Sequence, residues 1–292
     1  MDPLAFRQLT TAGVRTGAVL GWQHARVHDD LEVAHELGLD LVRLDVPWAE
    51  CAPRHDQLDG GVIEAVRTAA AQARSFGMQV WFRLLQPRLP HWFDDEGGLS
   101  DQRAVTTHWP RWVEQAAEQL GDVADGWVPF EAPYAMAHRI EPNDARRHAT
   151  LVHHLMVGWR DAWRILHGPA PVVASIDLAT LASESRSATG GMWVGAFRDG
   201  RMRIPGRVER RLDQLAGSCD ILGLALRTDV EATLYRIADV GGGLPLALTF
   251  RPTGNSDAER AHHLALVQAE VDRAAEEVQL RAVLTTALTP HT

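Results

Sequence analysis

Short runs of consecutive apolar residues recur along the chain, separated by longer stretches that mix apolar and polar positions. Runs that are apolar on successive rather than alternate residues are typical of parallel strands covered on both faces. Because the runs are spread over the whole sequence, they favour one continuous parallel sheet. The predicted strands are 17–22, 41–46, 79–84, 126–130, 171–176, 219–226, 244–250 and 280–286.

The stretches between the runs carry apolar residues at helical spacing. Gly38, Gly77 and Gly121 follow three of these stretches, where a helix commonly ends on glycine. Strands and helices that alternate in this order predict an α/β fold, a (β/α)8 TIM barrel formed by a single domain over residues 1–292. The predicted helices are 28–37, 62–76, 104–120, 144–166 and 257–277.

Two departures from a regular barrel are visible. Residues 184–215 form a long connection between the fifth and sixth strands, and loops of that length are typically lids or binding loops. The chain ends soon after the eighth strand, so we expect a shortened barrel that lacks its last helix. The seam between the eighth and first strands then lacks its outer cover, and we expect self-association as a homo-oligomer or another protein partner there; the alternative is that residues 3–11 cover the seam.

The net charge and the lengths of the apolar runs limit the kinds of partner that this chain can bind. The net charge of −9 leaves no basic stripe for nucleic acid or for an anionic membrane surface. The first thirty residues lack the apolar core of a signal peptide, and no apolar run reaches the ~20 residues that span a bilayer. We therefore expect no nucleic acid and no membrane among the partners, and a cytoplasmic location.

Several chemistries are excluded as well. All 29 basic residues are arginine, so no lysine can form a Schiff base or carry pyridoxal phosphate. Cys51 and Cys219 form neither a disulfide framework nor a metal-binding pair. The adjacent histidines at 153–154 and 262–263 point ~100° apart on a helix and do not chelate. With no motif for nucleotide, metal or acyl-enzyme chemistry, no cofactor and no metal ion are expected.

Several segments resemble motifs of one enzyme family, in the family's order and spacing. Residues 42–48 (VRLDVPW) are similar to its Tyr-Arg-Phe-Ser-Ile-Ser-Trp, and residues 215–223 (LAGSCDILG) to its approach to the sixth strand. Residues 127–133 (WVPFEAP) and 244–251 (LPLALTFR) resemble its fourth and seventh strands. Over nearly the whole chain the sequence thus resembles the family 1 glycoside hydrolases, the β-glucosidase family.

The resemblance implies that the family's catalytic pair is missing. The acid/base Glu of its Thr-Phe-Asn-Glu-Pro motif falls on Ala132, and the nucleophile Glu of its Ile-Thr-Glu-Asn-Gly motif falls on Phe250. Retaining glycosidases need two carboxyl groups ~5–5.5 Å apart, one as nucleophile and one as acid/base. We therefore expect a degenerate barrel that is not an active retaining β-glucosidase.

Active sites of this fold lie at the barrel mouth, formed by the carboxyl ends of the strands. The positions matched to the family, together with residues at strand ends, predict which side chains line this mouth. Glu131 is the expected proton-transfer group, with Asp177 second. The predicted ligand-binding residues are Gln23, Arg43, Trp48, Gln86 and Arg251.

Three functions stay open at this point. The first is a barrel without glycosidase activity that binds a small polar or sugar-like ligand or serves as a scaffold. The second is an enzyme of changed chemistry that uses Glu131 as general acid/base, and the third is a residual β-glycosidase. An inert mouth in which Arg43, Arg251, Glu131 and Asp177 pair with one another is a further alternative.

Overall fold

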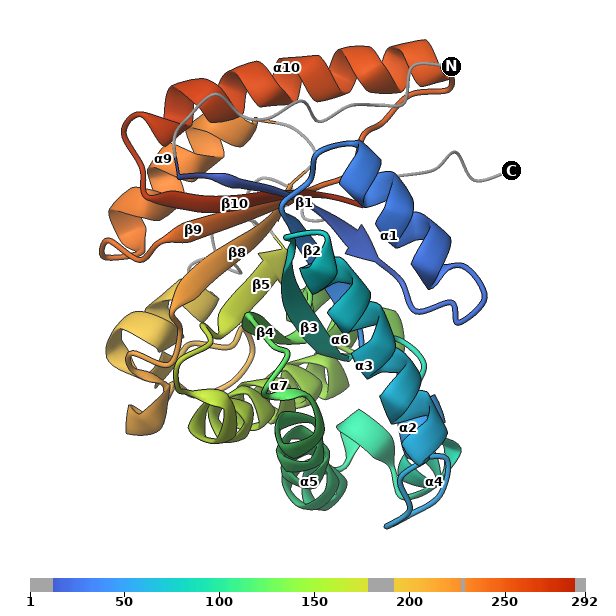
Figure 1. The fold of residues 1–292 in the computed structure, drawn as a ribbon. Helices are drawn as coiled ribbons and strands as arrows, with labels where there is room; N and C mark the ends of the chain where they lie inside the picture. The colour runs from blue at the N-terminus through green and yellow to red at the C-terminus, as the bar shows by residue number, and fades with distance from the viewer. Residues whose placement is uncertain (1–12, 178–191, 227–228, 287–292) are drawn as a thin grey trace.

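The computed structural model describes residues 13–177, 192–226 and 229–286. Its centre is an eight-stranded parallel sheet rolled into a barrel, in the order β4-β3-β2-β1-β10-β9-β8-β5 (Figure 1). Every strand expected from the sequence is present, which confirms the predicted α/β class and the (β/α)8 barrel. The strands are β1 (Arg15–Leu20), β2 (Leu41–Asp45), β3 (Gln79–Leu85), β4 (Gly126–Phe130), β5 (Val173–Asp177), β8 (Ile221–Leu226), β9 (Leu246–Phe250) and β10 (Leu280–Thr285).

The barrel closes between β4 and β5 through isolated bridges rather than a regular ladder. One bridge pairs Trp127 with Val172, and the next pairs Glu131 with Ser175. Between the two bridges the chain advances four residues along β4 but only three along the β5 segment. The extra residue makes a bulge in β4. Pro129 lies in this interval and has no N–H to donate to a neighbouring strand. The bulge thus sits immediately before Glu131.

Helices surround the barrel (Figure 1). The five helices predicted from apolar periodicity are confirmed, with ends shifted by a residue or two. Gly38 and Gly77 have φ angles of 70° and 82°, the left-handed conformation that favours glycine after a helix. The confirmed helices are α1 (Val27–Glu36), α3 (Gly60–Ser75), α5 (Gln102–Leu120), α7 (Ala145–Leu166) and α10 (Asp257–Ala275).

Other helical segments were not predicted, and most are too short for a periodic signal. In α9 the buried residues Val230, Leu234 and Ile237 do recur at helical spacing, so a sequence signal existed and was missed. These segments are α2 (Trp48–Cys51), α4 (His91–Asp95), α6 (Pro133–Ile140), residues 192–199 and α9 (Val230–Val240), with 3-10 turns η1 (Gly98–Ser100) and η2 (Asp213–Leu215).

The long connection expected over 184–215 is more ordered than a single loop. In its described part, the helix at 192–199 is followed by a small antiparallel pair, β6 (Arg201–Met202) and β7 (Arg210–Arg211). Trp193 and Phe197 are 2% exposed and contact Phe130 and Trp159. Buried aromatic residues therefore pack this segment against the barrel wall, and its residues 184–191 lie outside the described part.

Two cores lie on either side of the barrel wall. One fills the space between strands and helices, and the other fills the interior, with Leu41, Trp81 and Ala247 among its members. Because side chains alternate along a strand, Arg43, Arg83 and Thr249 lie two residues further along, on the same inward side. A polar layer therefore follows the apolar interior toward the carboxyl ends of the strands.

The predicted seam is a regular strand pair, since β1 and β10 are paired in parallel from Arg15 with Ala282 to Ala18 with Thr285. Residues 3–11, the alternative cover of this seam, lie outside the described part, and the expected self-association stays a prediction. Within the described ranges, no helix is both long enough and apolar enough to cross a membrane.

Candidate functional site

An ion-pair network occupies the polar layer inside the barrel. Arg43 of β2 donates from Nη2 to Oε1 of Glu131 over 2.6 Å, and Arg83 of β3 donates from Nη1 to Oε2 over 2.6 Å. Glu131, just after β4, thus has each carboxylate oxygen bound by a different guanidinium. The sequence placed both Arg43 and Glu131 at the barrel mouth and left their pairing as an alternative; in the structure they are in contact although 88 positions separate them.

Arg83 extends the network to a second carboxylate. Its Nε and Nη2 donate to the two oxygens of Asp45 over 2.7 and 2.6 Å, in the bidentate geometry that suits a guanidinium. Arg43 also donates from Nη1 to the Thr249 hydroxyl over 3.4 Å. Two arginines and two carboxylates alternate, so their formal charges cancel. We call Arg43, Asp45, Arg83 and Glu131 the mouth network.

Burial makes these charges interact strongly. The side chains of Arg43 and Glu131 are 2% and 18% exposed. Burial raises the pKa of Glu131, but the positive charges of Arg43 and Arg83 outweigh it, and the net pKa is lowered. Burial likewise lowers the pKa of Arg83, and the carboxylates of Asp45 and Glu131 outweigh that effect, so its pKa is raised. Both groups therefore stay ionised at neutral pH.

This arrangement favours some chemical roles over others. A carboxylate whose pKa is lowered does not hold a proton at neutral pH, so Glu131 is poorly suited to act as a general acid. As an anion it can accept a hydrogen bond or orient the two guanidiniums. The Nε–H of Arg43 is buried and has no hydrogen-bond partner among the described residues. A buried donor of this kind requires a partner, such as a water molecule or a ligand oxygen.

Two of the other predicted site residues form hydrogen bonds to backbone groups. The amide of Gln86 donates to the carbonyl oxygens of Val46 and Arg83 over 2.6 and 3.4 Å, which fixes the ends of β2 and β3. Asp177, at the end of β5, accepts from the backbone N–H of Ala135 over 3.0 Å and so caps the first turn of α6. Both contacts position segments around the mouth.

The remaining predicted residues lie differently. Gln23 and Arg251 are exposed, just beyond the ends of β1 and β9. Trp48 is 1% exposed and stacks on Trp112 with ring centroids 5.8 Å apart. The prediction that Trp48 binds a ligand is therefore wrong: consecutive aromatic contacts bury its ring in the core between strands and helices.

Neither position implied as catalytic by the resemblance offers an ionisable group. Ala132 has a left-handed backbone, with φ 48°, and its N–H donates to Ser175 over 2.9 Å across the bulge. Phe250 is fully buried, and its ring meets His263 of α10 edge-on with centroids 5.1 Å apart. Phe250 thus packs against the helix layer, while its neighbour Thr249 faces the mouth network.

Sequence reasoning missed Asp45 and Arg83. A signal was available, because both are charged residues within otherwise apolar strand runs, two positions beyond Arg43 and Trp81 respectively. A charge at an inward-facing position of a buried strand requires a partner nearby.

Comparison with known proteins places this geometry in context. No protein-family profile matches the chain. It is 28% identical over 111 residues to the β-glucosidase-like protein SFR2, chloroplastic, of Oryza sativa subsp. japonica, covering 36% of this chain and 17% of that protein. It is 24% identical over 163 residues to Klotho of Rattus norvegicus, covering 51% of this chain and 16% of Klotho. The matches therefore span less than a quarter of these relatives.

Solved structures match over most of their length. The β-glycosidase from Pyrococcus horikoshii superposes with a TM-score of 0.84 at 14% identity, covering 97% of this chain and 85% of that one. The β-glucosidase from Thermotoga maritima in complex with castanospermine gives 0.82 at 11% identity, covering 95% and 89%. The barrel fold is thus that of β-glycosidases, and the sequence matches to β-glucosidase-like proteins confirm the resemblance as a divergent one.

Proposed function

We propose that this chain, a divergent β-glucosidase-like barrel, binds a small polar, sugar-like ligand at its mouth and does not hydrolyse β-glycosides by the retaining mechanism. The observation that carries the proposal is the mouth network, in which both oxygens of Glu131 are bound by Arg43 and Arg83.

Retaining hydrolysis needs one carboxyl group that attacks the sugar and another that donates a proton to the leaving group. Glu131 has a lowered pKa and two guanidinium partners, and Asp45 is bound bidentately by Arg83. Neither carboxylate of the network is therefore free to act in either role. Ala132 and Phe250, which the resemblance aligns with the catalytic pair, cannot supply the missing groups.

Ligand binding is supported by the character of the same groups. Specific small-molecule sites place a few polar groups where they fix the orientation of a ligand. The mouth network holds rigid guanidinium and carboxylate groups of opposite charge, and the buried Nε–H of Arg43 still requires an acceptor. Sugar hydroxyls both donate and accept hydrogen bonds, so they can pair with the guanidinium donors and with the carboxylate acceptors of the mouth network. The β-glucosidase-like relatives make a sugar or polyol the first class to test.

The experiment has a catalytic and a binding arm. Hydrolysis of an aryl-β-glucoside is measured for the wild type and for Glu131→Gln, with Glu118→Gln on the exposed face of α5 as a matched control. Circular dichroism first establishes that each variant is folded. We expect turnover at the background level in all three proteins, and Glu131-dependent turnover would establish a residual glycosidase instead.

In the binding arm, monosaccharides, polyols and sugar acids are screened by thermal shift and then by calorimetry. We expect at least one compound to stabilise the wild type, to bind Glu131→Gln at least ~10-fold more weakly, and to be recovered unchanged. A compound that binds and is converted would favour the enzyme of changed chemistry. Failure of every class to bind would favour an inert mouth and contradict the proposal.

A further inference from the structure

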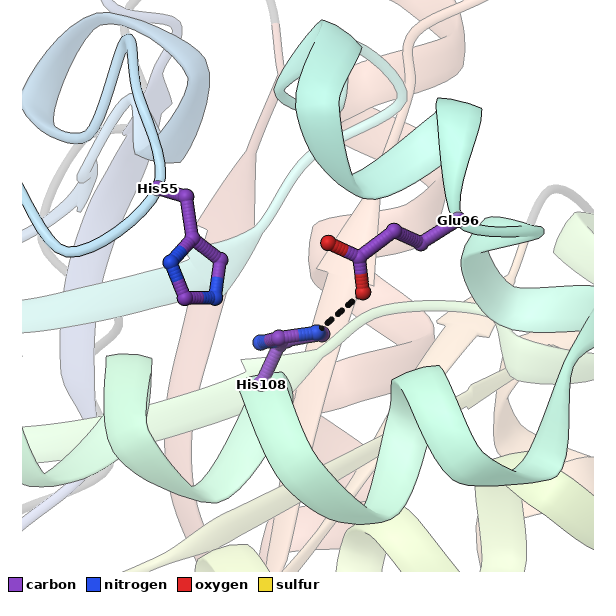
Figure 2. Close-up of side chains that lie close together, drawn as sticks. All are labelled: His55, Glu96 and His108. Atoms are coloured by element: carbon purple, nitrogen blue, oxygen red, sulfur yellow. Dashed lines mark hydrogen bonds and ion pairs between the residues drawn. The ribbon is translucent and has the colours of Figure 1, made fainter.

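A second cluster of chemically active side chains lies beside the mouth, between the segments that follow β2 and β3. His55 lies in the turn after α2, Glu96 at the end of α4, and His108 in α5. One nitrogen or oxygen of each lies within 4.8 Å of the others. Figure 2 shows the three side chains converging from three separate segments.

Two of the three groups are already in contact. His108 Nε2 lies 2.7 Å from Glu96 Oε2 (Figure 2). The ring of His55 lies 5.0 Å from the ring of His108, centroid to centroid, and is nearly perpendicular to it. The two imidazoles and the carboxylate therefore face a common point instead of stacking on one another.

His55 is oriented by a second carboxylate. Its Nδ1 lies 2.8 Å from Oδ2 of Asp56, and Oδ1 of Asp56 accepts from Arg111 over 2.6 Å. A histidine that donates from Nδ1 to a carboxylate presents the lone pair of Nε2. Metal-binding histidines almost always have such a partner, which fixes the ring and increases its basicity.

The surroundings hold the rings in place. Trp92 meets both His55 and His108 edge-on, each with centroids 5.1 Å apart, and its indole N–H donates to Ala52 over 2.8 Å. His55, Trp92 and His108 line a cavity of about 20 Å³. Room of that size suits one water molecule or one ion. His108 is 8% exposed whereas Glu96 is 50% exposed, so one ligand is fixed and another can adjust.

We propose that His55, Glu96 and His108 bind one divalent first-row transition metal ion, of which Zn²⁺ fits best, with a water molecule as fourth ligand. Two imidazoles and one carboxylate are a donor set typical of zinc, whereas calcium and magnesium prefer all-oxygen sites. With bonds of ~2.0–2.2 Å, tetrahedral ligand atoms lie ~3.3 Å apart. The atoms here span from 2.7 Å to at most 4.8 Å, so shifts of about 1 Å complete the site.

The bound ion would connect three segments that are otherwise held by packing and hydrogen bonds. The turn carrying His55 follows β2, which holds Arg43 and Asp45, and the segment carrying Glu96 follows β3, which holds Arg83. The ion therefore acts as a brace on the side of the barrel mouth formed by β2 and β3. No motif of fixed spacing marks the site, because its ligands come from three elements.

The test uses the full chain, freed of metal by chelator and dialysis, and titrated with Zn²⁺ alone in a calorimeter. We expect one ion per chain with a micromolar or tighter Kd, and an increase in Tm. His55→Gln and His108→Gln should each weaken binding at least ~100-fold. Asp56→Asn, which removes only the orienting charge, should weaken it about 10-fold. His262→Gln, an exposed histidine of α10, is the control and should bind as the wild type does.

Because His108 is largely buried, its variant can fail to fold, and His55→Gln at the more exposed position then decides. Substitution with Co²⁺ adds a direct readout: a tetrahedral site gives intense visible absorption bands, which should be absent from His55→Gln. Equal zinc affinity in the wild type, His55→Gln and His262→Gln would show only scattered surface binding and would overturn the proposal. A stoichiometry well below one ion per chain would overturn it as well.

Discussion

Removing the charge of Glu131 is the sharpest test of the mouth network. In Glu131→Gln the guanidiniums of Arg43 and Arg83 lose their shared anion, and the amide places an N–H donor against one of them. The network then carries one uncompensated positive charge in a site where Arg43 is 2% exposed. Removing one partner of a fully buried ion pair costs about 3–5 kcal/mol.

Glu131 is 18% exposed, so water offsets part of this cost, and we expect a loss of about 2–4 kcal/mol in the free energy of unfolding. Urea denaturation followed by circular dichroism measures the loss, with Glu118→Gln on α5 as the control. The control should stay within about 0.5 kcal/mol of the wild type, as surface substitutions usually do.

A double-mutant cycle separates the ion pair from the loss of either residue. Arg43→Met together with Glu131→Gln restores neutrality, so the double variant should be more stable than the sum of the single losses predicts, by about 1–3 kcal/mol. Strict additivity, or a loss in Glu131→Gln no larger than in the control, would refute the view that the network is held by coupled buried charges.

Three further outcomes are expected. Ala132→Gly should raise the free energy of unfolding by about 0.5 kcal/mol in urea, because relief of left-handed strain exceeds the added chain entropy, and a loss would contradict that strain. His153 is buried, and burial together with the nearby Arg207 lowers its pKa to about 4. In the unfolded chain the same imidazole takes up a proton near pH ~6.5. The contribution of neutral His153 to the free energy of unfolding is therefore complete above that pH and is lost as the pH falls toward 4, by up to about 1.4 kcal/mol per pH unit. The stability of His153→Leu should depend less steeply on pH over this range. Burial raises the pKa of Cys51 and Cys219 to about 12, so both thiols should resist a disulfide reagent at pH 8 until the protein is unfolded, and rapid native-state labelling would contradict this.

The sequence by itself determined the barrel. The apolar run at 41–46 and the periodic stretch at 62–76 became β2 and α3 because strand and helix formation depend on residues that are near in sequence. The same local reading missed α6, whose eight residues are too few for a clear period, and overlooked the apolar spacing within α9.

Which side chains meet was decided by the tertiary structure. The sequence placed Arg43 and Glu131 at strand ends, but their contact depends on the register of β2, β3 and β4 and on the bulge before Glu131. The inward direction of Arg83, and the convergence of His55 with His108, likewise follow from how distant segments pack. Pattern along a chain fixes each element, whereas a site requires positions of elements relative to one another, which only the packed barrel supplies.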